Sequence, residues 1–89
     1  MAELTLKIKN KVGLHARPAA LFVQTASKFK STITVKNGDV SANAKSILHI
    51  LTLGAGNGST IRVIAEGEDA TQALKALEEL NASNFGEKE

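Results

Sequence analysis

Residues 13–18 bring together a histidine, an arginine and a proline in the order Gly-Leu-His-Ala-Arg-Pro. A histidine can act as a nucleophile near neutral pH, and an arginine can bind an anion through two parallel hydrogen bonds. A proline has a fixed φ of about −65° and no backbone N–H, so it suits the first turn of a helix. His15, Arg17 and Pro18 therefore predict a helix that begins beside a histidine able to handle a phosphoryl group.

The apolar spacing that follows Pro18 supports a helix over about residues 16–27. Its apolar stripe repeats every three to four residues and comprises Ala19, Phe22, Val23 and Ala26. His15 would then lie at or beside the N-cap, where the unpaired backbone N–H groups of Ala16 and Arg17 point outward. These groups carry the positive end of the helix dipole, so the position favours an anion.

His15 has a structural interpretation as well as a chemical one. A histidine beside a helix start can serve only as a polar cap, and Arg17 alone can be a solvated surface residue. Because the helix dipole disfavours an imidazolium at this end, however, we expect the ring to be neutral and nucleophilic. A phosphoryl group on the ring would be a dianion, which the helix start and a bidentate contact from Arg17 would stabilise. The combination favours a site that accepts and releases a phosphoryl group.

The composition is that of one small domain, over residues 1–89, without cysteine chemistry. The chain has 89 residues, no cysteine and a hydrophobic fraction of 43%, which allows a core but neither a disulfide framework nor a thiolate metal site. No apolar run approaches the roughly 20 residues that cross a bilayer, and the first residues resemble a strand rather than a signal peptide. We expect a cytoplasmic monomer with no cofactor, no metal and no membrane insertion.

Charge is distributed unevenly along the chain. Residues 1–62 carry nine Lys and Arg against two acids, whereas residues 63–89 carry two against seven. We expect a face lined with basic groups. Together with Lys45, such a face would suit an acidic partner surface and speed the encounter with it.

Alternating apolar residues predict four strands. The alternating apolar residues are Leu4, Leu6 and Ile8; Ile33 and Val35; Val40, Ala42 and Ala44; and Ile61, Val63 and Ala65. Asn37 and Gly38 are expected to be the central residues of a hairpin turn, where both tolerate positive φ. The element order is then β-α-β-β-α-β-α, an α+β arrangement in which helices cover one face of an antiparallel sheet.

Two further helices follow from capping signals. Ser46 is the expected N-cap of a short helix that ends before Gly54 at C′, and the glycines at 54, 56 and 58 form a loop. Residues 69–72 read as a capping box for the last helix. The apolar stripe of that helix comprises Ala73, Leu74, Leu77 and Leu80, and a polar tail is expected from about Asn81 onward.

Several residues have more than one interpretation. Ser46 is either a structural cap or a phosphoacceptor, and the cap is favoured. Ile47, Leu48 and Leu51 are either core or an exposed partner patch, and a patch is favoured because so short a helix cannot bury every side. His49 has no second ligand at metal spacing, so we expect a surface residue. The glycine loop lacks the spacing of a nucleotide-binding motif, and no serine, histidine and aspartate set indicates a hydrolase.

Two stretches resemble a known family. Residues 13–19, followed by Ala44-Lys45-Ser46-Ile47 and Thr52-Leu53-Gly54, are similar to HPr, the histidine-containing phosphocarrier of the bacterial phosphoenolpyruvate:sugar phosphotransferase system. The resemblance runs from about residue 3 to residue 80. It implies an open-faced β-sandwich of four antiparallel strands with three helices on one side, and a carrier rather than an enzyme.

The resemblance also implies roles for individual residues. His15 would accept a phosphoryl group on Nδ1 from phosphorylated enzyme I and pass it to enzyme IIA domains, with Arg17 assisting. Ser46 matches a position that an HPr serine kinase/phosphorylase modifies in part of the family. The matching partner face comprises Leu14, Ala16, Ala20, Leu21, Gln24, Ser27, Ile47, Leu48, Leu51 and Thr52.

Three alternatives remain at this point. Within the family, a nitrogen-related phosphocarrier would have the same histidine chemistry and different partners. A nucleic-acid-binding protein is disfavoured because the three aromatic residues, Phe22, Phe29 and Phe85, do not form a stacking platform on a sheet. A ligand-binding regulatory domain of similar element order is the third, and nothing in the glycine loop supports a specific ligand.

Overall fold

The computed structural model describes residues 2–9, 16–56, 58–83 and 85 of the chain. The elements occur in the expected order, β-α-β-β-α-β-α. They are β1 (Ala2–Lys7), α1 (Ala16–Ala26), β2 (Thr32–Asn37), β3 (Val40–Asn43), α2 (Ile47–Leu51), β4 (Thr60–Glu66) and α3 (Ala70–Ala82). Each predicted helix and strand is therefore present, with boundaries within a few residues of those expected.

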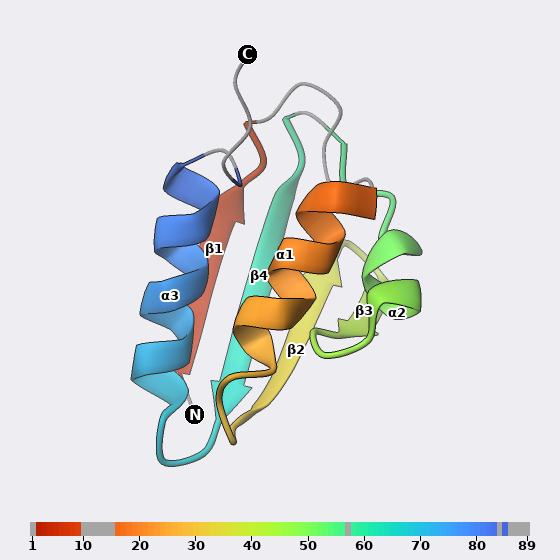
Figure 1. Ribbon diagram of the computed structural model, residues 1–89. Helices are drawn as coiled ribbons and strands as arrows, with labels where there is room; N and C mark the ends of the chain where they lie inside the picture. Colours follow the sequence, from red (N-terminus) through yellow and green to blue (C-terminus); the bar gives the residue numbers. More distant parts are fainter. Residues whose placement is uncertain (1, 10–15, 57, 84, 86–89) are drawn as a thin grey trace.

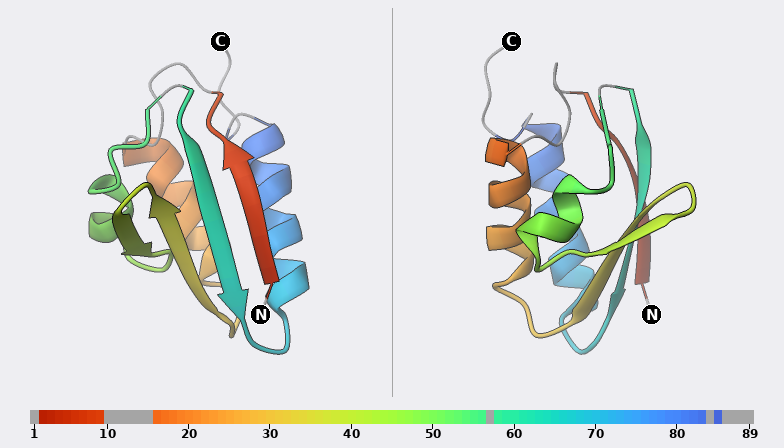
Figure 2. Two further views of the ribbon diagram at one scale, coloured as in Figure 1. Left: turned by 180° about the vertical axis from the view of Figure 1, so that it is seen from behind. Right: turned by 90° about the vertical axis from the view of Figure 1, so that its right-hand side faces the viewer.

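The four strands form one antiparallel sheet in the order β1-β4-β2-β3. Figure 1 and Figure 2 show α1, α2 and α3 together on one face of this sheet, with the opposite face uncovered. The central strands β4 and β2 are adjacent although β3 and α2 lie between them along the chain. The predicted α+β class, an open-faced sandwich, is confirmed.

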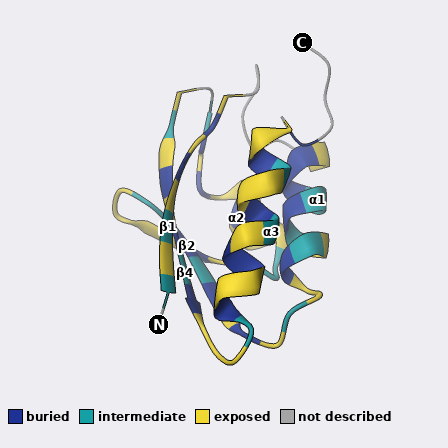
Figure 3. Ribbon diagram, turned by 90° about the vertical axis from the view of Figure 1, so that its left-hand side faces the viewer, coloured by how far each residue is buried: buried dark blue, intermediate teal, exposed yellow. Residues whose placement is uncertain are grey.

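The core lies between the sheet and the helices. Each strand alternates between buried inward residues and exposed outward ones, and the helices present their buried stripes to the sheet (Figure 3). The inward layer includes Leu6, Ile8, Ile33, Val35, Ile61, Val63 and Ala65. The facing helix layer includes Ala19, Phe22, Ala26, Ala73, Leu74 and Leu77. Both apolar stripes that periodicity predicted are confirmed, except that Val23 and Leu80 are only partly buried.

The hairpin turn lies one residue later than predicted. Asn37 pairs with Val40, so Gly38 and Asp39 are the central residues of the turn. Only Gly38 has a positive φ, of 60°, which is the arrangement of a type II′ turn with glycine at the first central position. The expectation that Asn37 adopts positive φ was wrong, because Asn37 completes the strand. Its side chain instead donates a hydrogen bond to the carbonyl oxygen of Leu53, at 2.8 Å.

The predicted capping box at residues 69–72 was also wrong. Asp69 is the N-cap of α3, but its backbone is not extended (φ −102°, ψ 22°) and its side chain makes no cap hydrogen bond. The carboxylate instead accepts hydrogen bonds from the backbone N–H groups of Lys30, at 2.8 Å, and Ser31, at 2.9 Å, and from the Ser31 hydroxyl. Asp69 therefore joins the β4–α3 connection to the α1–β2 connection, which no local sequence pattern indicates.

The Asp69 hydrogen bonds make stability depend on pH. The Ser31 hydroxyl, above all, and the Lys30 N–H hold the pKa of Asp69 below its ordinary 3.8. A lowered folded-state pKa means that the carboxylate contributes stability above pH 3.8 and loses it as the pH falls through the folded-state value. We expect Asp69→Asn to lower the urea midpoint at neutral pH, and the gap from the parent protein to narrow below pH 3.8. A gap that stays constant with pH would contradict this assignment.

The chain beyond Leu80 is not simply a polar tail. The last helix, α3, continues through Asn81 to Ala82, and Asn81 is buried and donates from Nδ2 to the carbonyl oxygen of Lys7 at 3.0 Å. Phe85 is also buried and joins the core cluster. The expected tail boundary was placed too early, because a single asparagine does not reveal that its amide has a partner on β1.

Smaller corrections concern the end of α2. Thr52 is the C-cap, so Leu53 is at C′, and Gly54, which was predicted there and has a φ of 65°, lies one residue further along the chain. No helix among the described residues has the length and apolar character needed to span a bilayer.

Candidate functional site

The start of α1 is where the sequence places the chemistry. Leu14 and His15 lie outside the described residues, so their predicted positions are not tested. The helix begins at Ala16, with Pro18 buried in the first turn, as expected from the fixed φ of proline. Ala16 and Arg17 are exposed, so this end of the helix is open to a partner or an anion.

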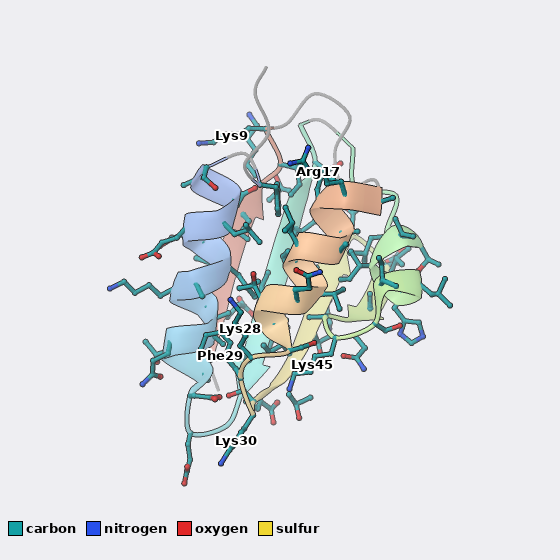
Figure 4. All side chains as sticks on the ribbon, viewed as in Figure 1. Lys9, Arg17, Lys28, Phe29, Lys30 and Lys45 are labelled. Atoms are coloured by element: carbon teal, nitrogen blue, oxygen red, sulfur yellow. The ribbon has the colours of Figure 1, made fainter. Side chains whose placement is uncertain are left out.

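Arg17 lies in the first turn of α1 and extends into solvent. Figure 4 places its side chain at the same end of the fold as Lys9. Within residues 2–9, 16–56, 58–83 and 85, the Arg17 guanidinium has no hydrogen-bond or ion-pair partner. All five of its N–H donors are therefore available to a phosphate, which accepts them in a planar fork.

Ser46 is the N-cap of α2, which confirms the structural interpretation of this residue. Its backbone is extended (φ −122°, ψ 114°) and its hydroxyl accepts a hydrogen bond from the N–H of His49. The Oγ to N distance is 3.4 Å, longer than the usual range for such bonds. The hydroxyl is partly exposed and only weakly engaged. Whether it also accepts a phosphate is not tested.

Helix α2 exposes most of its apolar side chains. Ile50 is fully buried, whereas Ile47, Leu48 and Leu51 are 38%, 72% and 40% exposed. A helix of five residues can direct only part of its circumference to the core, so the remaining apolar residues face solvent. These three residues form what we call the α2 patch. The prediction of an exposed patch rather than core is confirmed.

The α1 side of the expected partner face is more mixed. Figure 1 shows α1 and α2 adjacent. The α1 members divide into exposed residues, Ala16, Gln24 and Ser27, and half-buried ones, Ala20 and Leu21. Leu21 packs partly against the core. Thr52 is exposed, and its hydroxyl donates to the carbonyl oxygen of His49 at 2.6 Å, so it presents a methyl group more readily than a hydrogen-bond donor.

The basic residues do not form the single face that their distribution along the chain suggested. Lys28, Lys30 and Lys45 lie at the opposite end of α1 from Arg17 (Figure 4). Three more basic side chains, on Lys7, Lys36 and Arg62, belong to the sheet. Strand alternation directs those three to the uncovered face, because their neighbours in sequence point into the core.

Lys45 has a structural partner that sequence reasoning missed. Its Nζ donates to the carbonyl oxygen of Phe29 at 2.7 Å, which ties the β3–α2 turn to the end of α1. No local signal identifies this pair, since the two residues are 16 positions apart. Among the described residues, no group of three or more His, Cys, Asp or Glu side chains could hold a metal ion.

Comparison with known proteins gives consistent results. The family model described as the PTS HPr component phosphorylation site matches residues 2–83. A phosphocarrier protein HPr from Treponema pallidum is 42% identical over 98% of this chain and 99% of its own. A crystal structure of an HPr from Thermoanaerobacter tengcongensis is 55% identical, covers 100% of both chains and has a TM-score of 0.96. An HPr dimer from the same organism is 56% identical over 98% of this chain and 100% of its own, with a TM-score of 0.79.

The described residues form a small open-faced sandwich that exposes the start of α1, with Ala16 and Arg17, and the α2 patch. The chain belongs to the HPr family, and it is a phosphocarrier protein of the phosphotransferase system, or PTS.

Proposed function

We propose that His15 is the residue that carries the phosphoryl group. Its Nδ1 accepts the group from phosphorylated enzyme I, so that one P–N bond breaks on the donor histidine as another forms on His15. The group then passes to an enzyme IIA domain in the same way. Such in-line exchange needs little from the carrier except position and charge.

The observation that best supports this proposal is the guanidinium of Arg17, two residues after His15, which has no hydrogen-bond or ion-pair partner among the described residues. A phosphoryl group on His15 would bring a dianion to the end of a helix whose first N–H groups, those of Ala16 and Arg17, have no helical partners. Arg17 would add a charge-assisted contact. These contacts would stabilise the phosphohistidine while still allowing the phosphoryl group to transfer to the next partner.

The carrier role has further consequences. The protein is loaded and unloaded by other enzymes, so it has no turnover of its own and needs no cofactor. It acts in the cytoplasm, where enzyme I and the IIA domains meet it. A nitrogen-related branch of the same system would use the same histidine with different partners. Parallel loading assays, one with enzyme I of the sugar system and one with enzyme I of the nitrogen-related system, distinguish the two branches.

The test is to incubate the protein with phosphoenolpyruvate and enzyme I and to follow the phosphate by mass and by chemical stability. We expect one added phosphoryl group that acid removes and base does not, as for a phosphohistidine. An acid-stable, base-labile phosphate would place the group on a hydroxyl instead and would refute the proposal for His15.

The partner face is proposed to centre on the α2 patch. Leu48 is its most exposed apolar member, so Leu48→Ser should leave folding intact. We expect this change to raise the KM of enzyme I for the protein about tenfold, because a buried leucine contributes about 1.5–3 kcal/mol to a contact. Steady-state loading kinetics with enzyme I measure the effect.

Val40 provides the matched control for Leu48. It is another exposed apolar residue, at 42%, but it lies at the β2–β3 hairpin rather than on α2. Val40→Ser should leave the KM unchanged. Equal effects of the two substitutions would show that general surface polarity, and not the α2 patch, governs the encounter.

Ser46 is proposed as a regulatory site, modified by an HPr serine kinase/phosphorylase where one is present. A phosphate there would add negative charge beside the α2 patch and repel an acidic enzyme I. We expect Ser46→Asp to load several times more slowly than the parent, with a difference that shrinks at high salt. Ser46→Asn is the control, since asparagine caps a helix as well as aspartate but carries no charge. Equal loading of the two variants would contradict the electrostatic role.

The protein is proposed to act as a monomer. Because one related HPr crystallised as a dimer, the proposal is tested by sedimentation at concentrations used for the loading assay. A dimeric species under those conditions would refute it.

A further inference from the structure

A concave site lies where β2, β3 and the start of α2 meet. Its volume is about 460 Å³, which is in the range of small-molecule sites. Its polar lining consists of Thr32, Thr34, Ser41, Asn43, Lys45 and His49. Ile33 and Ala42 also line the site, but their side chains are buried and point into the core, on the other face of the sheet. The side chains that the site presents to solvent are therefore the hydrogen-bonding ones.

Several of these six polar side chains make no hydrogen bond within the described part of the structure. In the part of the chain that the structure describes, the hydroxyls of Thr34 and Ser41 and the ring of His49 have no hydrogen-bond or ion-pair partner. The Asn43 side chain uses only its oxygen, which accepts from the N–H of Lys45 at 2.9 Å. Hydroxyls and amides that converge on a concave surface without partners are suited to a hydroxylated ligand.

Lys45 gives the site a positive charge in a defined position. Its ammonium group has three donors, and the bond to the Phe29 carbonyl oxygen uses one of them. The side chain is half-buried and held by this bond, so less of its freedom has to be lost when a ligand binds. No Asp or Glu is among the described residues that line the site. The electrostatics therefore favour an anion.

We propose that this concavity binds a small organic phosphate that carries hydroxyl groups. The ammonium of Lys45 contacts the phosphate, while Thr34, Ser41 and Asn43 contact the hydroxyls. Lys45 lies at the opposite end of α1 from Arg17 (Figure 4), so the site is separate from the proposed phosphohistidine and does not depend on it.

The test uses glycerol 3-phosphate as the probe, with inorganic phosphate and glycerol as separate arms. Amide chemical shifts of the whole protein are followed by NMR as each probe is added. We expect glycerol 3-phosphate to shift the amides of Thr34, Ser41 and Lys45 and to bind in the millimolar range, as suits so small a molecule. It should bind at least five times more tightly than inorganic phosphate, because only the ester engages the hydroxyl lining. Glycerol alone should bind more weakly still.

Substitutions separate the contribution of the hydroxyl groups from that of the Lys45 charge. Thr34→Val and Ser41→Val remove a hydroxyl from a strand while keeping a side chain that strands favour. Each should reduce the preference for glycerol 3-phosphate over inorganic phosphate about threefold or more. Lys45→Met should weaken both anions about tenfold, whereas Lys75→Met, on α3, should change neither. His15→Ala should bind like the parent protein, which keeps this test independent of the carrier proposal.

Two results would overturn the proposal. One is a set of shifts spread over the lysines generally or concentrated at Ala16 and Arg17, which would mean nonspecific or helix-end anion binding. The other is equal affinity for glycerol 3-phosphate and inorganic phosphate in the parent, unchanged in Thr34→Val and Ser41→Val.

Discussion

Replacement of His15 by alanine is expected to abolish loading by enzyme I. The reaction needs a nitrogen nucleophile that is neutral, accessible and positioned for in-line attack, and alanine supplies none. Arg17 and the first N–H groups of α1 would remain, but they stabilise a phosphoryl group without accepting one. The expected loss is therefore complete within the sensitivity of the assay. Phosphoenolpyruvate-dependent incorporation of phosphate measures it.

The fold should survive this change. Loss of a polar group at a helix start costs about 1 kcal/mol, which is small beside the stability of a folded domain. Circular dichroism and the urea midpoint should confirm this. The control is His49→Ala, which removes the other histidine of the chain and should load at nearly the parental rate. If His49→Ala lost the phosphoryl group and His15→Ala kept it, the assignment would be reversed.

The substitution Gly67→Ala is expected to cause the largest loss of stability. Gly67 has a φ of 145°, a region that residues with a side chain rarely adopt. A methyl group there would lie 2.6 Å from Ser31 Oγ and 2.9 Å from Ser31 Cα. Ser31 is buried and cannot move aside, because Asp69 holds both its N–H and its hydroxyl. The backbone itself would have to shift.

The unfavourable φ and the close contact with Ser31 both lower the free energy of unfolding of Gly67→Ala. Backbone strain and overpacking each cost about 1–3 kcal/mol, so Gly67→Ala should lower the free energy of unfolding by about 2–5 kcal/mol. Each kcal/mol corresponds to about 4–8 °C in Tm for a domain of this size. Thermal and urea unfolding followed by circular dichroism measure the change.

Gly56→Ala is the matched control for Gly67. A methyl group there meets nothing within 4 Å, and Gly56 does not have a positive φ. This substitution should change the midpoint little. Similar losses for the two variants would show that glycine content in loops, rather than the contact with Ser31, determines the stability.

Hydrogen bonds between distant segments were the part of the fold that sequence patterns did not reveal. Asp69 follows a pattern typical of a capping box, yet its carboxylate binds Lys30 and Ser31. Asn81 resembles the start of a polar tail, yet its amide binds the Lys7 carbonyl. In each case a short polar side chain can bond either to its own helix or to another segment. Only the packing of the elements decides between them.

The candidate site also combines features that local sequence patterns predict with features that only the packing of the elements decides. The helix start at Ala16 and the N-cap at Ser46 follow from local backbone preferences of proline and serine, and both are confirmed. The exposure of the α2 patch follows from an excess of apolar residues on a short helix. The two groups of basic residues at opposite ends of α1 do not follow from the sequence, because charge along the chain carries no information about distance in space.

What the sequence by itself determined is the order of elements, their inward faces, the family and the residues proposed for phosphoryl transfer. These depend on interactions within a few residues, on the two periodicities of helix and strand, and on short motifs. The tertiary structure alone decided the partners of Asp69, Lys45 and Asn81, the close contact that requires glycine at position 67, and the concavity beside β3. Each of these joins segments far apart in the chain, and such contacts exist only once the helices have packed onto the sheet.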